Sequence, residues 1–554
     1  MADVVESQYM FVEYAAATVP SPNGKRRRGG PTEVRSHITR EFHRRTKIKR
    51  LKACTGITAT PELKLQARTG AAEEDHDAKQ VEESQSPEKD PEMGAAWNRC
   101  SSNDISLQQS DAHRSNVFLG DGGFNAFDIL TGQRMPRYIH LVLDHALQIS
   151  WPNTLPVMSK AVVNPVKGAW LKCAMQWPVV FHAFIYATTL HLLCAYNGQE
   201  LIESGPLMRL SHKTETIKLV NEQLRSLKSP ASDALIMAVV ILAIHGSRDE
   251  KEYPKVHPPS PLASAQNLHV YGNMVADEQH TQAILLLIKQ KGGLEAFELF
   301  GMADTMALCD LYFSTKHICR PAFSLRRPPQ SLVVDGKHVL DSRAIELDSE
   351  LGTGFRYFRS NSTSCELLEV LQSFSEVTNA LDHHARGGST APELVDLIEA
   401  RNASQHRLLS NLPERVDLTD AESCVQQATR LATLIFSDMV VFPLPPTQRV
   451  KPRLARNLID ILEACDLLRC WDLHGQVLMW ALTLGAIAAS FTPERIWYVD
   501  QLKYRCSVWS VDELPLLESI CSKFLWWGEV CGGPVLTLWS EVQAGFPAIH
   551  ILAD

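Results

Sequence analysis

The sequence predicts an all-α protein, in which a basic helix and a disordered linker precede an irregular helical bundle or solenoid-like body. Apolar residues recur at spacings of three and four through most of the chain after residue 210. One of these stretches is apolar on every side, as in a helix at the centre of a core. With 554 residues, 45% of them hydrophobic, the chain can bury one large core or two ordinary ones.

The first element is a basic segment, residues 25–52, which reads KRRRGGPTEVRSHITREFHRRTKIKRLK. Twelve basic residues are opposed only by Glu33 and Glu41, a net charge of +10. Since the whole chain carries −8, the remaining residues carry −18. Nuclear import receptors and phosphate backbones both recognise such a cationic block. The candidate contact residues are Lys25, Arg26, Arg27, Arg28, Arg35, Arg40, Arg44, Arg45, Lys47, Lys49, Arg50 and Lys52.

The pattern inside this segment predicts a helix. Residues 29–31, Gly-Gly-Pro, break the chain, and Thr32 can cap a helix that follows. Val34, Ile38 and Phe42 then share one face at spacings of four. We expect a basic amphipathic helix that serves nuclear import, direct contact with nucleic acid, or both. A solvated helix or a disordered tail without a binding role is the alternative.

The composition inverts between residues 53 and 121. The acidic side chains of residues 53–93 outnumber the basic ones, with Ser, Gln and Pro between them and no aromatic residue. Such a segment cannot bury enough apolar surface to offset its ordering entropy. We expect a disordered linker that acts as a spacer. An acidic activation region is the alternative, but those usually interleave aromatic residues with acids.

The folded body is expected from about residue 122 to residue 554. In its first half, Ser211 is a candidate cap for a helix with Ile217, Val220 and Leu224 on one face. Ser232 is a candidate cap for an apolar helix that Gly246 can terminate. Two further helices are expected over residues 280–291, before a Gly-Gly pair, and over residues 303–316.

The helical pattern lapses between about residues 317 and 361. Three prolines interrupt it, and Asp335-Gly336 lies at the centre of a possible hairpin. We expect a mobile loop between two helical halves. Helices are predicted again around 367–381, 394–398, 424–440, 453–468 and 471–489. The late tryptophans are expected to fix the final helices to the core; they are Trp497, Trp509, Trp526, Trp527 and Trp539.

Composition restricts the compartment. The first ten residues carry two acids and no apolar run, so they do not predict a secretory signal. Thirteen scattered cysteines fit a reducing compartment better than a disulfide framework. Two uncharged runs, 173–199 and 475–493, contain glutamines and, in the first, histidines, so we expect buried core helices rather than membrane spans. The sequence therefore predicts a cytosolic or nuclear protein.

No motif in the sequence predicts catalysis or a metal centre. No Cys-x-x-Cys, Gly-x-Ser-x-Gly, Walker loop or His-Glu-x-x-His occurs. The closest cysteines, Cys465 and Cys470, are expected to be core thiols. Residues 382–384, Asp-His-His, are interpreted as the last turn of a helix, with a catalytic role as the alternative. We assign no catalytic residue, metal ligand or cofactor.

Several segments follow one another in an order similar to that of a known family. They are Phe11-Val12, VRSHITREFHRRTK at 34–47, HKTETIKLVNEQL at 212–224, SDALIMAVVILA at 232–243, HTQAILLLIKQKGGLEAF at 280–297, MWALTLGAIAA at 479–489, Trp497-Tyr498-Val499 and Phe524-Leu525-Trp526. From about residue 135 onward, together with the basic segment, the chain resembles filamentous-fungal proteins with a fungal-specific transcription factor domain. The resemblance implies an all-helical regulatory domain.

The resemblance also implies a function. Members usually carry a binuclear zinc cluster ahead of this domain, and this chain lacks the six cysteines that it needs. We expect a nuclear regulator of transcription, for instance of a specialised-metabolite gene set, without enzymatic activity. Its expected partners are an import receptor, DNA directly or through a partner transcription factor, a small effector, and a second copy of the chain. A nuclear interaction protein without DNA binding, a helical enzyme and a peripheral membrane protein are the alternatives.

Overall fold

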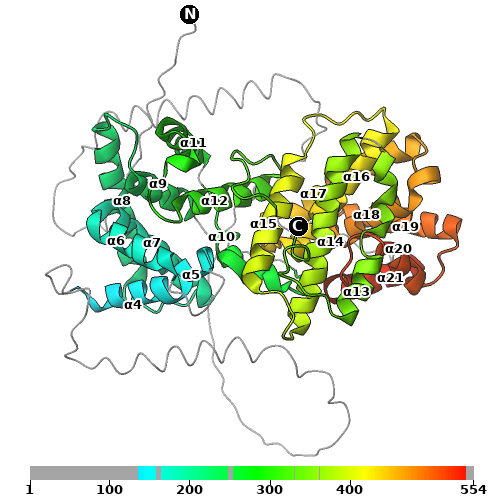
Figure 1. Ribbon diagram of the computed structural model, residues 1–554, viewed down its shortest axis with the longest axis horizontal. Helices are drawn as coiled ribbons and strands as arrows, with labels where there is room; N and C mark the ends of the chain where they lie inside the picture. The colour runs from blue at the N-terminus through cyan, green and yellow to red at the C-terminus, as the bar shows by residue number, and fades with distance from the viewer. Residues whose placement is uncertain are drawn as a thin grey trace, which may run out of the picture. The chain divides into compact units, whose positions relative to one another are not determined.

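Helices are the only regular elements in the described part of the chain. The computed structural model describes residues 135–156, 164–246, 254–276, 278–329, 331–360 and 362–544, and within these ranges it has no strand (Figure 1). The prediction of an all-α fold is confirmed. The basic segment 25–52, the linker 53–121 and the start of the body at residue 122 lie outside the described residues.

A first hydrophobic core and the helices around it are cyan to green in Figure 1. Their bounds are α4 (Arg137–His145), η2 (Ala146–Ser150), α5 (Trp151–Thr154), α6 (Pro165–Gln176), α7 (Pro178–Ala195), α8 (Gly205–Arg225), α9 (Asp233–Ile244), α11 (Glu278–Lys291), η4 (Leu294–Ala296) and α12 (Met302–His317). Helix α9 is apolar on every side and buried along nearly its whole length. Its neighbours therefore surround it, and Ser232 caps it by accepting a hydrogen bond from Leu235 N at 3.2 Å.

Helix α7 is the one described helix that is long and apolar enough to cross a membrane. Most of it is buried inside the first core, where α8 and α9 pack against it. The run 475–493 likewise falls mainly on the buried helix α18 (Trp471–Ala488). Both runs are core helices, as their polar residues predicted.

Helix α8 begins six residues before the expected cap. Its first turn opens with Gly205-Pro206, and proline is favoured there because the first N–H groups of a helix have no acceptor in it. Ser211 lies in the interior of the helix, so its prediction as the cap is wrong. The apolar face with Ile217 and Val220 is buried, as expected.

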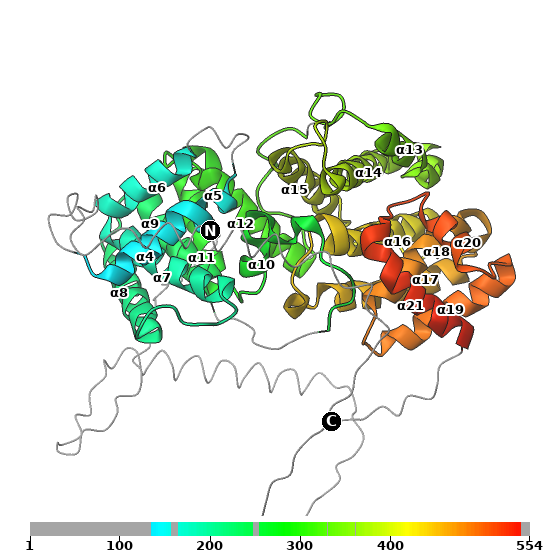
Figure 2. The same ribbon diagram turned by 90° about the horizontal axis from the view of Figure 1, so that it is seen from below.

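A second core contains the remaining helices, which are green to red in Figure 1. They are η3 (Pro261–Asn267), α10 (Leu268–Tyr271), α13 (Ser342–Glu350), η5 (Thr353–Ser360), α14 (Ser362–Arg386), α15 (Leu394–Ser410), α16 (Ala421–Phe436), η6 (Ser437–Val441), η7 (Pro446–Gln448), α17 (Val450–Leu467), α18 (Trp471–Ala488), α19 (Glu494–Trp509), α20 (Leu514–Cys521) and α21 (Gly528–Ala544). Helix α18 lies among α16, α17 and α19 to α21 (Figure 2).

Close backbone approach fixes α19 against α18. A Cβ atom on Gly485 would lie 2.4 Å from the ring of Tyr498, so only glycine fits there. The buried Tyr498 hydroxyl donates a hydrogen bond to Ala455 O of α17 at 2.7 Å. The late tryptophans pack as expected: Trp526, Trp527 and Trp539 are buried, and Trp497 and Trp509 are half-buried against the second core.

The segment 317–361 contains more helix than the sequence predicted. Helix α13 and the 3-10 turn η5 occupy its second half, and Asp335-Gly336 forms a tight turn closed by a bond from His338 N to Leu332 O at 2.8 Å. The possible hairpin is therefore wrong. Asp341 caps α13 by accepting from Ala344 N at 2.8 Å. Only Ala344 of that helix is buried, so its sequence shows no apolar face.

A buried arginine joins the two cores. Arg401 of α15 is fully buried, and its guanidinium donates to Leu262 O at 3.0 Å and to Gln266 Oε1 at 3.1 Å. Gln266 and Asn267 both adopt left-handed backbone conformations at the end of η3. Asn267 donates to Ser150 O at 2.9 Å, which connects this turn to the first core. A series of hydrogen bonds thus connects α15 to η2.

We predict that Arg401→Met destabilises the protein by about 3 kcal/mol, because the substitution leaves buried acceptors without a donor. Urea unfolding of the purified protein measures this change. The matched control is Arg407→Met on the same helix, where Arg407 pairs with the exposed Glu369 at 2.7 Å; its loss should stay below about 1 kcal/mol. Equal losses in the two variants would contradict the role given to Arg401.

Candidate ligand cavity

A cavity of about 360 Å³ lies against the first core. Its walls come from α5, α6, α7, α9, α10, α11 and α12 and from the chain that follows α12, and most of the lining is apolar. Helix α9 contributes Met237, Val240, Ile241 and Ile244, which share one face at spacings of three and four. A mainly apolar pocket of this size with a few polar groups is typical of a small-molecule site.

Aromatic rings form one wall of the cavity. Trp170 stacks on Phe184 with ring centroids 5.7 Å apart, and Trp151 meets the same phenylalanine at 4.8 Å. The indole of Trp170 is fixed by a hydrogen bond from Nε1 to Phe300 O at 3.1 Å. Tyr271 lines the cavity as well. These large, oriented rings give the cavity a rigid shape before any ligand enters.

His245 is a polar group at the end of α9, and it lines the cavity. Its Nδ1 lies 2.9 Å from Ile241 O, and its own carbonyl accepts a hydrogen bond from the Tyr186 hydroxyl at 2.5 Å. Burial lowers the pKa of His245 to about 4, so the ring is neutral at pH 7. Its Nε2 is buried and has no hydrogen-bond partner among the described residues.

Gly246 holds the end of α9 in place through a close contact between backbone segments, which the sequence did not suggest. The helix ends at Ile244, and a Cβ atom on Gly246 would lie 2.0 Å from Val275 O. Glycine is therefore needed for close approach between two backbone segments rather than as a helix terminator with positive φ. This contact fixes the position of His245 beside the cavity.

Two cations, Lys316 of α12 and Arg320, line the cavity. Nζ of Lys316 donates to Met274 O at 2.8 Å and to Tyr271 O at 3.3 Å. Burial lowers the pKa of Lys316 to about 8. The ammonium group therefore binds the backbone that leads from α10 to α11 and uses two of its N–H donors for these hydrogen bonds.

A larger cavity of about 450 Å³ borders both cores and has a charged lining. Those charges pair with one another: Arg326 Nε lies 2.9 Å from Asp304 Oδ1, and Lys337 Nζ lies 2.9 Å from Asp396 Oδ1. A ligand there would have to break existing ion pairs. The apolar cavity of the first core is therefore the better candidate site.

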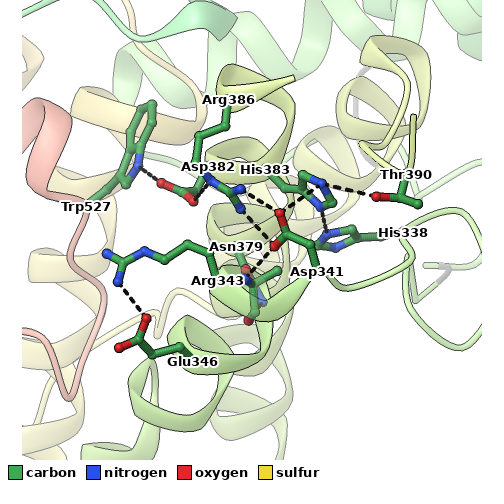
Figure 3. Close-up of polar contacts among 11 residues, drawn as sticks. His338, Asp341, Arg343, Glu346, Asn379, Asp382, His383, Arg386, Thr390 and Trp527 are labelled. Atoms are coloured by element: carbon green, nitrogen blue, oxygen red, sulfur yellow. Dashed lines mark hydrogen bonds and ion pairs between the residues drawn. The ribbon is translucent and has the colours of Figure 1, made fainter. Parts of the chain in front are cut away.

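The Asp-His-His trio lies in the last turn of α14, as the sequence predicted. His383 Nδ1 lies 3.0 Å from His338 Nε2, and His383 Nε2 lies 3.4 Å from Asp341 Oδ2 (Figure 3). Arg386 contacts both oxygens of Asp341, at 2.6 and 3.1 Å. These hydrogen bonds hold the pKa of Asp341 well below its usual range.

Asp382 completes this polar cluster, which fastens three helices together. It accepts hydrogen bonds from Arg386 Nε at 2.9 Å and from Trp527 Nε1 at 3.0 Å (Figure 3). Asp341 at the start of α13, the end of α14 and the residue before α21 are thereby joined. Most of these polar groups pair with one another, although Nδ1 of His338 is buried without a hydrogen-bond partner among the described residues, and the arrangement is that of a structural clasp.

Among the described residues, no group of three His, Cys, Asp or Glu could hold a metal ion. Cys465 and Cys470 are buried core thiols, as expected. Every basic residue proposed for import or nucleic-acid contact lies in the segment 25–52, outside the described residues.

None of the residues that line the cavity was named as a site residue from the sequence. The apolar residues of α9 can be seen in the sequence, but an all-apolar helix does not indicate which of its faces borders a cavity.

Comparisons of the chain with protein-family models, curated proteins and solved structures give no match. The resemblance to the fungal-specific transcription factor domain therefore stays a prediction.

We predict that stability falls as the pH drops from about 6.5 to about 4. His145 Nε2 lies 2.9 Å from His191 Nδ1 inside the first core. Burial lowers the pKa of His145 to about 3 and that of His191 to about 4. Unfolded histidine titrates near pH 6.5. On acidification the unfolded state therefore binds protons at a higher pH than the folded state does. Each buried histidine thereby lowers the free energy of unfolding by on the order of 1–3 kcal/mol.

Urea unfolding at pH 7 and pH 5 measures this loss. The double variant His145→Gln/His191→Gln should show a smaller difference between the two pH values than the natural chain. A free energy of unfolding that is the same at both pH values in the natural chain would contradict the prediction.

Proposed function

We propose that the protein is a nuclear regulator of transcription whose helical body binds a small apolar effector. The observation that carries the proposal is the separation of charge along the chain. A net charge of +10 in residues 25–52 stands against −18 in the rest. A cationic block of this density favours an import receptor or a phosphate backbone as its partner.

The all-helical body is a second observation that supports the proposal. An all-α regulatory domain is what the family resemblance implies, and the described residues form an all-α body. The cavity of the first core offers an effector site with mainly apolar walls. An effector that binds there would stabilise the packing of α9, α11 and α12 around it.

Target recognition has two forms within this proposal. Phosphate contacts by the basic segment position a protein on DNA but carry no base sequence. A partner transcription factor would then supply the choice of target genes. The alternative is a nuclear interaction protein that reaches promoters only through that partner, without its own DNA contacts.

The location of a fluorescent fusion tests the nuclear assignment. We predict nuclear signal for the intact chain and a shift to the cytoplasm when Lys25 to Arg28 and Arg44, Arg45, Lys47 and Lys49 are changed to alanine. Changing Lys64, Arg68, Lys79 and Lys89 in the linker, together with four exposed lysines of the body, is the charge-matched control and should leave the signal nuclear. Cytoplasmic or membrane signal from the intact chain would refute the proposal.

Salt dependence tests direct DNA contact. If the basic segment binds several phosphates, the affinity of the purified protein for duplex DNA should fall steeply with salt, with a slope near −0.9 for each phosphate in a plot of log K against log salt. Absence of duplex binding at low salt would exclude direct contact. Promoter occupancy by a chain without residues 1–52, supplied with a foreign import signal, would favour the partner model.

A further inference from the structure

We propose that an exposed surface on the second core is a docking site for a basic amphipathic helix of a partner protein. Three Asp-Leu pairs form this surface, and we call it the Asp-Leu surface: they are Asp417-Leu418, Asp466-Leu467 and Asp472-Leu473. The inference goes beyond the proposed function, because it does not depend on the cavity, on a nuclear location or on contact with DNA.

The leucines of the Asp-Leu surface are far more exposed than is usual for large apolar side chains. Leu467 and Leu473 are 85% and 86% exposed, and Leu418 is 50% exposed. Single exposed apolar residues are common on proteins, whereas a group of them marks an interaction site. The aspartate that precedes each leucine is exposed as well. Each apolar side chain therefore has a negative charge beside it.

Packing within the second core brings the three pairs together at the turn between α17 and α18. The second and third pairs flank this turn, one at the end of α17 and one in the first turn of α18. The thiol of Cys470 in the turn lies 3.8 Å from Ala421 O at the start of α16. The thiol of Cys424, one turn further along α16, lies 3.7 Å from Asp417 O. The loop that carries the first pair thus lies beside the turn that carries the other two.

The backbone under the Asp-Leu surface is fixed by α19. Nη2 of Arg505 lies 2.5 Å from Asp466 Oδ1, and its guanidinium lies 4.2 Å from the centre of the Trp471 ring. A Cβ atom on Gly475 would lie 1.8 Å from the ring of Trp509, so α18 and α19 approach closely there. The side chain of Asp466 nevertheless remains 56% exposed. A surface that is ordered beforehand loses little conformational entropy on binding.

Acidic groups outnumber basic ones around the exposed leucines. Residues 415–422 and 463–474, together with Arg505, carry six acids and three bases, a net charge of −3. The acids are Asp417, Asp420, Glu422, Glu463, Asp466 and Asp472, and the bases are Arg415, Arg469 and Arg505. Hydrogen bonds from Thr419 lower the pKa of Asp417 and keep it ionised. Charge complementarity therefore favours a partner with Lys and Arg around an apolar centre.

A basic amphipathic helix has this chemistry. Its apolar residues form one stripe at spacings of three and four, and Lys or Arg side chains border the stripe. Their long apolar stems can cover the leucines while their charged ends reach the aspartates. A partner strand would need the edge of a sheet, and the described residues contain no strand. An acidic helix would meet charges of its own sign.

Fluorescence anisotropy of three labelled synthetic peptides, titrated with the purified full chain, tests the proposal. The first peptide has leucine and lysine placed so that the leucines share one helical face. The second has glutamate in place of lysine, and the third has the composition of the first in an order without a helical face. The first peptide should bind on the order of tenfold more tightly than either of the others, and salt should weaken its binding.

Variants of the full chain locate the contact. Leu467→Ser/Leu473→Ser should weaken binding of the first peptide by on the order of tenfold, because the apolar centre is lost. The matched control is Leu207→Ser/Val334→Ser, since these residues are 69% and 84% exposed elsewhere on the body. It should bind as the natural chain does. All four side chains are exposed, so neither variant removes core packing.

A charge variant tests the acidic border separately. Glu463 and Asp472 are exposed, and Glu463→Gln/Asp472→Asn keeps the leucines while it removes two negative charges. Binding of the first peptide should weaken and should depend less on salt than in the natural chain.

Five results would overturn the inference. Three concern the peptides: no binding of the first peptide, equal affinity for all three, or unchanged affinity in Leu467→Ser/Leu473→Ser. The fourth is peptide binding that appears only after the basic residues of 25–52 are changed to alanine, which would assign the surface to the chain's own basic segment. The fifth is self-association of the natural chain that Leu467→Ser/Leu473→Ser abolishes, which would assign the surface to a second copy.

Discussion

The buried guanidinium of Arg401 is the constraint on which the rest of the structure depends. A charge in a fully buried position is costly unless it is hydrogen-bonded. The guanidinium of Arg401 donates to the carbonyl oxygens of Leu262 and Ala265 in η3 and to Oε1 of Gln266, while its Nε has no hydrogen-bond partner among the described residues. Asn267 then contacts the first core at Ser150 and at His191. The two cores thus share a polar joint at η3, and the cavity walls contributed by α5 and α7 are held from it.

Many of the helices between residues 205 and 489 could be predicted from the sequence, because each buries an apolar face or carries a cap, whereas α4 to α6 were not predicted. Ser232 and the apolar run after it are an example in which local pattern and tertiary packing agree. Helix α13 could not be found in this way, since only Ala344 is buried. The start of α8 was misplaced because Ser211 resembles a cap, whereas Gly205-Pro206 opens the helix. The signal for α13 was Asp341, a residue typical of caps.

The candidate site could not be predicted, because it is a property of space between helices. Gly246 was visible as a helix terminator, yet its role is the approach to Val275 O, more than 25 residues away in the chain. The same holds for His245, whose tautomer is set by its own helix and whose unpartnered nitrogen is set by its neighbours.

If the cavity of the first core is an effector site, the helical body should carry a bound small molecule. Native mass spectrometry of the full chain, purified from the cells that express it, detects such a molecule. We expect a mass above that of the polypeptide, and loss of the added mass in the cavity-filling variant Ala187→Leu, because Ala187 lines the cavity. The polypeptide mass alone for the natural chain, or the same added mass in both proteins, would contradict it.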